Sequence, residues 1–144
     1  MTTKVQSYVI SVIATLSACG RSTQHALAAS PAGLCYRLAA APSQPEILIP
    51  GGVRLTDKHA TSHFSNLKGR VAQPLDPDTM PSLASLLWLS TSDSLTLVYD
   101  HYFVHVEARL ARLGDSLAGT ATYSSDVRGG ADPHWIVSGH RTPC

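Results

Sequence analysis

The sequence predicts an all-β fold, namely a small antiparallel β-barrel or sandwich of about seven or eight strands of ordinary length. Three observations predict it: apolar and polar residues alternate along many short segments, turn residues separate these segments, and no long helical period is present. We expect closure into a barrel, because a closed sheet has no exposed edges and brings the two ends of the domain together.

The most regular stretch is a hairpin in the C-terminal half, with strands near residues 102–112 and 116–124. Gly114-Asp115 between them is a two-residue turn of the kind that joins hairpin strands. Counting outward from this turn pairs apolar residues with apolar residues, so the register is self-consistent. It places Leu110 opposite Gly119, Ala108 opposite Ala121, Val106 opposite Tyr123, Arg109 opposite Thr120, Glu107 opposite Thr122 and, next to the turn, Arg112 opposite Leu117.

A strand near residues 94–99 precedes this hairpin and completes an antiparallel meander. We expect a tight turn around Asp100-His101, which would set Leu97 opposite Val104 and Leu95 opposite Val106. Because a one-residue slip would turn the apolar face toward water, the register is strongly specified. The side chains expected to face inward are those of Leu95, Leu97, Val104, Val106, Ala108, Leu110, Ala121 and Tyr123.

The remaining elements follow from shorter patterns. Apolar runs bounded by turn residues indicate strands, and proline-rich stretches indicate loops. Strands are expected at "LCYRLA" (34–39), at "EILIPGGVRLT" (46–56) as two short strands around Gly51-Gly52, at "SLLWLS" (85–90) and at "HWIVSGH" (134–140). A short helix is expected at "TDKHATSHFSNL" (56–67), and a long surface loop at "AQPLDPDTMPS" (72–82).

The N-terminus has the pattern of an export signal. Met1–Ser7 carries one charge, and Tyr8–Leu16 is an apolar run of nine residues, too short to cross a ~30 Å hydrocarbon core. The following "LSAC" resembles the lipobox of bacterial lipoproteins, which implies that Cys19 becomes the lipidated N-terminus. On this interpretation residues 1–18 are a signal peptide, 19–33 the lipidated cysteine with a flexible tether, and 34–144 a single β domain.

The alternative is cleavage by ordinary signal peptidase after "HALA" (25–28), which leaves a long polar interval behind the apolar run. Both interpretations export the chain. The lipobox resemblance implies a membrane-anchored protein of the cell envelope, held at the outer membrane and facing the periplasm. Several acyl methylenes buried at about 0.8 kcal/mol each make such an anchor stable.

Export also predicts a disulfide. With Cys19 lipidated, Cys35 and Cys144 remain, and they would lie in an oxidising compartment with an even cysteine count. A bond between them closes a loop of about 110 residues, for which the chain-entropy model gives a stabilisation of about 4–5 kcal/mol. We therefore expect a staple that joins the first strand to the last.

The charge balance excludes one class of partner. Loss of Lys4 with the leader leaves ten basic and ten acidic side chains, and no basic block occurs. Nucleic acid is therefore not an expected partner. The expected contacts are the membrane, through the lipid, and an envelope protein or polymer.

The C-terminal half is similar to a known family. The run "DSLTLVYDHYFVHVEARLARLGDSLAGTATYSSDV" with the terminal "RTPC" resembles a family of small uncharacterised bacterial predicted lipoproteins, and "GDSLAGTA" and the last cysteine are the shared marks. The likeness covers residues 93–144, and "CYRLA" near residue 35 is its other end. It supports export and a β fold, and it implies no catalytic residue.

The seven histidines do not predict a metal site. His59 and His63 would share one face of a helix at a spacing that can bind zinc, but the glutamate that usually follows the first histidine is absent. His101 and His105, if both lie on one strand, are about 13 Å apart, too far for one metal ion. We expect neither a metal nor another cofactor.

Catalytic motifs are absent from the sequence as well. No G-x-S-x-G nucleophile motif occurs, and the pair Asp76 and Asp78 is separated by proline in a turn-like segment. We therefore expect a protein that is not an enzyme.

One face of the meander is the expected binding surface. Val98 and Phe103 are expected as an opposed apolar pair on the outer face, beside His105, Glu107 and Arg109. This mixed surface predicts an interaction module.

Two alternatives remain open. The small inward residues Ala108, Gly119 and Ala121 would leave room for a small apolar ligand in a lipocalin-like barrel, unless Trp88, Tyr99 and Tyr123 close the core. "TATYSSD" also has the strand-and-loop style of lipid-anchored lysozyme inhibitors, an analogy of fold alone.

Overall fold

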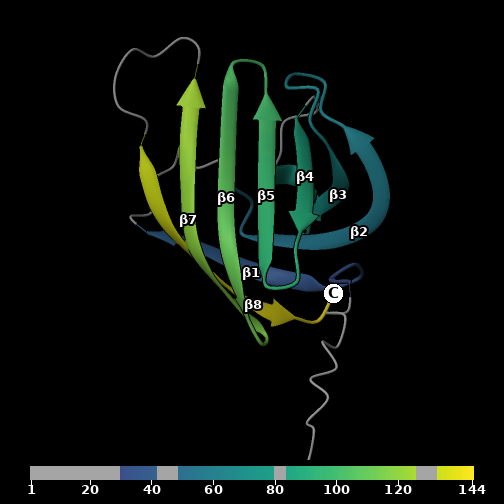
Figure 1. Cartoon of the computed structure of the whole chain (residues 1–144), viewed down its shortest axis with the longest axis vertical. Helices are drawn as coiled ribbons and strands as arrows, with labels where there is room; N and C mark the ends of the chain where they lie inside the picture. The colour runs from purple at the N-terminus through teal and green to yellow at the C-terminus, as the bar shows by residue number, and fades with distance from the viewer. Residues whose placement is uncertain (1–29, 42–48, 80–83, 126–132) are drawn as a thin grey trace, which may run out of the picture.

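A computed structural model describes residues 30–41, 49–79, 84–125 and 133–144. Its eight strands form a closed antiparallel barrel in which each strand pairs with the next and the last pairs with the first (Figure 1). The strands are β1 (Cys35–Ala41), β2 (Gly52–Thr61), β3 (Lys68–Pro74), β4 (Ser85–Ser90), β5 (Ser94–His101), β6 (Val104–Leu113), β7 (Ser116–Ser125) and β8 (His134–Thr142). The expected all-β class and barrel closure are confirmed.

Helical structure is minimal in these ranges. The 3-10 turn η1 (Pro77–Thr79) is the only helical element among the described residues, and they include no helix of the length and apolarity needed to cross a bilayer. The leader, the lipobox with Cys19 and the tether up to residue 29 lie outside the described residues.

The barrel interior is occupied by the protein's own side chains. Alternation along each strand sends apolar residues inward, where they form one continuous cluster. Four large aromatic rings belong to it, those of Tyr36, Trp88, Tyr99 and Trp135, and all four are buried. Trp88 Nε1 donates a hydrogen bond to the carbonyl of Thr56 at 3.0 Å, which satisfies its polar edge.

The β6–β7 hairpin has the register expected from the sequence. The two strands meet at the Gly114-Asp115 turn, where Gly114 has a φ of 64°. All six expected pairs are present, including Ala108 with Ala121 and Arg112 with Leu117. The hairpin is therefore determined by its local pattern.

The β5–β6 turn lies two residues further along the chain than expected. Tyr102-Phe103 form it, so Leu97 lies opposite Ala108 and not opposite Val104. Asp100 stays in the strand because it pairs with His105. A displacement by two residues preserves alternation, and the expected inward residues are all buried or packed against the core.

The β2–β3 hairpin differs from expectation. No helix forms at residues 56–67, because β2 continues to Thr61 and residues 62–67 form a loop. The Thr56 hydroxyl donates to the carbonyl of Val71 at 2.7 Å and so holds this segment to β3. A bulge in β2 between Leu55 and His59 bends the strand.

Two other expectations fail in this region. The expected loop at 72–82 is wrong in its first part, because Ala72–Pro74 belong to β3, while residues 80–83 lie outside the described residues. One strand, β2, begins at Gly52, whereas Ile49 and Pro50 are in no strand. Residues 46–48 of the expected first short strand lie outside the described residues.

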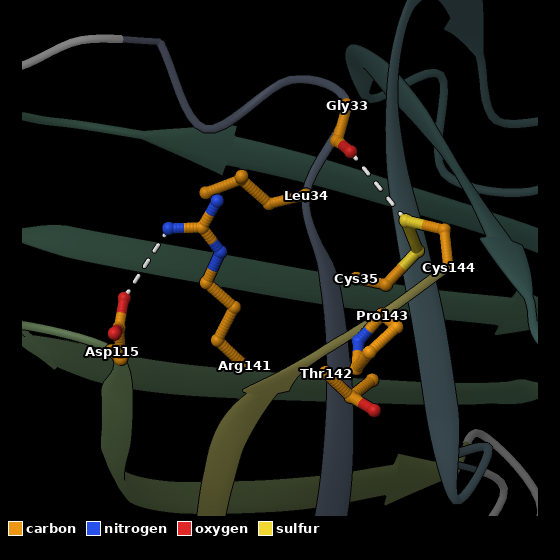
Figure 2. A pocket seen from close by; sticks show the side chains of 8 residues that line it. All are labelled: Gly33, Leu34, Cys35, Asp115, Arg141, Thr142, Pro143 and Cys144. Carbon is orange, nitrogen blue, oxygen red and sulfur yellow. Dashed lines mark hydrogen bonds and ion pairs between the residues drawn. A yellow bond between two sulfur atoms is a disulfide. The ribbon is translucent and has the colours of Figure 1, made fainter.

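The expected disulfide joins the two ends of the domain (Figure 2). The Cα atoms of Cys35 and Cys144 are 5.3 Å apart, within the range of a disulfide. Residues 30–33, which the sequence suggests are tether, pack on the barrel next to it. Pro31 is buried, and the Gly33 amide donates to the carbonyl of Leu55 at 2.7 Å.

Candidate functional site

The loop between β2 and β3 lies over the outside of the barrel. Leu87 and Val98 face outward by alternation, yet Val98 is only 3% exposed and Leu87 is equally buried. Ser65 and Leu67 of the loop share a cleft with Val98, and the backbone of Gly69 lies close to Leu87. The hairpin end therefore covers a small apolar patch on the outer face of β4 and β5.

A buried carboxylate holds this loop in place. Asp100, on the outer face of β5, is 2% exposed and accepts a hydrogen bond from the Ser65 hydroxyl. Its other oxygen lies 2.5 Å from Nδ1 of His105 on β6. Burial alone would raise the pKa of Asp100, but hydrogen bonds from Ser62, Ser65 and His105 outweigh it and lower that pKa. Asp100 therefore joins the loop to both strands as a carboxylate.

A cleft opens where the loop meets the sheet. Its volume is about 370 Å³, and it combines an apolar floor with a polar wall. Arg109 Nε donates to Glu107 Oε1 at 2.6 Å at its rim, in an exposed ion pair. The cleft is lined by Ser65, Leu67, Leu89, Thr96, Val98, His105 and Glu107. A ligand or partner could bury a small apolar group on the floor of this cleft and donate hydrogen bonds to its wall.

Aromatic side chains gather at the end of the same sheet. We call Phe64, His101, Tyr102 and Phe103 the aromatic edge. The Phe64 and Tyr102 ring centroids are 5.4 Å apart, and those of His101 and Tyr102 are 4.5 Å apart. Phe103 is 61% exposed, and Phe64 and Tyr102 are also exposed. Phe64, His101 and Tyr102 thus form one cluster of rings, and Phe103 adds an exposed ring at the same turn.

The turn that carries this edge is strained. Tyr102 has a φ of 49°, in the left-handed region where glycine or asparagine is favoured in two-residue hairpin turns. A bulky residue there costs about 1–2 kcal/mol. Departures of this kind from local preference gather at functional sites.

The structure brings together part of the expected binding surface. Val98, His105 and Glu107 line the cleft, and Arg109 reaches it through its ion pair with Glu107. The expected opposition of Val98 and Phe103 is wrong: Val98 lies opposite Glu107, and Phe103 lies in the turn. This follows from the displaced turn.

Sequence patterns missed Asp100, Ser65, Phe64 and Tyr102 as members of this region. Their contacts join segments 35 to 38 positions apart, which no local period reveals. The one available signal was "DHYF", which places two aromatic residues where a turn usually has small polar ones.

Within the described ranges, the histidines do not assemble as a metal centre. His59 lies in β2 and His63 in the following loop, so they share no helical face. His101 and His105 lie on different strands of one hairpin. Across the described ranges, no group of three or more histidine, cysteine, aspartate or glutamate residues is placed to hold a metal ion.

Comparisons with protein-family models, with curated proteins and with solved structures find no match for this chain.

Proposed function

We propose that this chain is a lipid-anchored interaction module of the cell envelope that docks another protein through its aromatic edge. The observation that carries the proposal is the set of exposed rings of Phe64, Tyr102 and Phe103 at a strained turn. Aromatic side chains are prominent among residues that dominate binding energy at protein interfaces. Folding alone does not explain why a two-residue turn carries Tyr102 and Phe103.

The position of the edge suits a protein held at a membrane. Ser30, where the tether would enter, lines a cavity with Thr91 and Ser92 of the β4–β5 turn. The aromatic edge lies at the opposite end of β5, about 23 Å away at ordinary strand rise. A lipid on Cys19 would therefore leave the edge directed away from its anchor.

A lipocalin-like carrier is the second candidate, and one observation favours it. The Tyr99 hydroxyl is buried in the barrel without a hydrogen-bond partner among the described residues, and burial raises its pKa. An internal ligand could supply an acceptor. The four buried aromatic rings argue against it, because they occupy the space that such a ligand needs.

Cross-linking tests the docking proposal. We would place a photo-reactive amino acid at Phe103 or at Leu113, which lie at the two ends of β6 and are both 61% exposed. A discrete adduct with another protein is expected from position 103 and not from 113, and Tyr102→Asp should abolish it. The same adduct from both positions, or none from 103, would contradict the proposal.

A stability control separates binding from folding. Phe103→Asp should change the free energy of unfolding by less than about 0.5 kcal/mol, because the side chain is exposed. Val106→Asp should cost several times more, because it places a charge in the barrel core. Equal losses would show that Phe103 is a core residue and would remove the proposed surface.

A further inference from the structure

Three arginines occupy inward-facing positions at one end of the barrel. Arg70 on β3 lies opposite Trp88, Arg112 on β6 lies opposite Leu117, and Arg141 on β8 lies opposite Tyr36. Alternation reserves such positions for apolar side chains, so these arginines depart from the pattern of the core, and two of them, Arg70 and Arg112, share a cavity. Departures from local rules without an evident structural gain point to function.

The two side chains line one cavity with several hydroxyl groups. Its volume is about 370 Å³, and we call it the arginine cavity. The lining is predominantly polar in character, with one buried proline at its wall. It consists of Ser30, Pro31, Arg70, Ser90, Thr91, Ser92 and Arg112. Segments from four parts of the chain therefore bring donors to the same place.

Neither guanidinium group of this cavity is neutralised by a carboxylate within the described part of the chain. Arg70 lies over the Trp88 ring at 5.0 Å, and its Nη1 lies 3.4 Å from the Ser30 hydroxyl. The Arg112 guanidinium has no hydrogen-bond or ion-pair partner among the described residues, whereas its backbone amide donates to the carbonyl of Asp93 at 2.8 Å. By contrast, Arg141 in the cavity beside the disulfide is paired with Asp115 at 3.4 Å (Figure 2).

The surrounding charge is positive. The carboxylate of Asp93 accepts hydrogen bonds from Thr91 Oγ1 at 3.0 Å and from Ser92 Oγ at 3.5 Å, so it is engaged within its own turn. Lys68 lines an adjoining cavity that shares Arg70 and Ser90 with this one. The two adjoining cavities are therefore lined by Arg70, Arg112 and Lys68, and no carboxylate is among their described lining residues.

We infer that the arginine cavity binds a phosphate group, either a monoester or a diester. Guanidinium groups donate paired hydrogen bonds that match phosphate oxygens, and stacking on an aromatic ring limits the freedom that Arg70 would lose on binding. The Ser30 hydroxyl accepts from the Ala32 amide and from Arg70, so its own hydrogen can serve as a further donor, as can that of Ser90. The chemistry is shared by two sources: a soluble phosphate compound, or a lipid headgroup near the point where the chain enters the barrel.

This site is separate from the proposed docking surface. The arginine cavity and the aromatic edge lie at opposite ends of β5, and they share no residue. Loss of one function need not affect the other, so the two proposals can fail separately.

Binding is tested on the mature chain, residues 19–144, carrying Cys19→Ser, so that neither an attached lipid nor the apolar run of the leader supplies membrane affinity. Inorganic phosphate and glycerol 3-phosphate are titrated at low salt, with amide NMR shifts around residues 90–92 and 112 as the readout. A second arm measures co-flotation with phosphatidylcholine vesicles that contain phosphatidylglycerol, against phosphatidylcholine alone. The variants are Arg112→Gln and Arg70→Gln, and the matched control is Arg54→Gln on the outer face of β2.

We expect saturable binding that Arg112→Gln or Arg70→Gln weakens about tenfold or more, because each removes charge-assisted hydrogen bonds. Arg54→Gln should change it by less than about twofold, because its charge is exposed and screened. Saturation by soluble phosphates without flotation assigns a soluble ligand, and flotation that depends on Arg112 assigns a lipid headgroup.

Two results would overturn the inference. One is the absence of saturable binding in both arms, and the other is an equal loss in Arg54→Gln, which would indicate general charge attraction. Arg70→Gln also removes the group stacked on Trp88, so melting curves are recorded for every variant. If Arg70→Gln is unstable, the binding measured for Arg112→Gln decides the test.

Discussion

The β6–β7 and β2–β3 hairpins are built from strands of similar length, but they differ in how they are specified. The first has ten consecutive pairs without a shift and one face toward the core. The second has six pairs interrupted by a bulge, and its end folds over the outer face of β4 and β5. Local alternation, together with the turn, is sufficient to set the register of the first hairpin. The shape of the second depends on the apolar patch of β4 and β5 that it covers.

The largest expected effect is in the regular hairpin. A Cβ at Gly119 would lie 1.9 Å from the carbonyl oxygen of Arg109, so Gly119→Ala forces the two backbones apart. We expect a loss of about 3 kcal/mol in the free energy of unfolding, measured by urea denaturation. Gly114→Ala in the turn meets no neighbour, and its positive φ should cost only about 1 kcal/mol.

The order of these two losses is the decisive result. If the turn variant were the more damaging one, the hairpin would depend on its turn and not on the close approach of its strands.

A smaller loss of stability is expected at Asp100, which holds the loop of the β2–β3 hairpin to the barrel. Asp100→Asn keeps the shape of the side chain but weakens its bonds to the Ser65 hydroxyl and to His105, and we expect a loss of about 1–3 kcal/mol. Hydrogen exchange should increase at residues 62–67 and remain slow in β6 and β7, because only the covering loop is released.

The same substitution in the regular hairpin is the control. Asp115→Asn removes a carboxylate that is paired with Arg141 and largely exposed, so the loss should be below about 0.5 kcal/mol. Comparable losses for the two aspartates would mean that Asp100 does not hold the loop.

The smallest effect is a pH dependence of the covering loop. Burial alone would raise the pKa of Asp100, but the hydrogen bonds from Ser62, Ser65 and His105 lower it below its ordinary value of 3.8. The ionised group therefore stabilises the folded state, fully above the unfolded pKa and less as pH falls through the folded pKa.

The stability difference between the wild type and Asp100→Asn should accordingly be constant near neutral pH and shrink below about pH 4. Urea midpoints measured at several pH values give this difference directly. A difference that grows on acidification would show that the folded state favours the protonated acid.

The β5–β6–β7 meander shows what the local alternation of apolar and polar residues can predict. Alternation and the Gly114-Asp115 turn predicted every partner named for β6–β7, because one buried face excludes odd shifts and the turn selects one of the remaining registers. The same rule gave the correct inward residues of β5, although the turn at Tyr102-Phe103 displaced their partners. A displacement by two residues keeps each side chain on the same face of the sheet. The buried residues of β5 were therefore predictable even though their cross-strand partners were not.

Period and parity along the chain are sufficient for the fold class and for the inward face of the meander. The disulfide of Cys35 with Cys144 was predicted from the expectation that Cys19 carries lipid, which leaves these two cysteines as a pair. Which outer residues are covered depends on the closed barrel. Val98 and Asp100 are buried by a loop from another hairpin, and Arg70 and Arg112, from strands that are not neighbours, line one cavity. Such contacts arise from strand curvature and closure, which bring together segments that no local pattern relates.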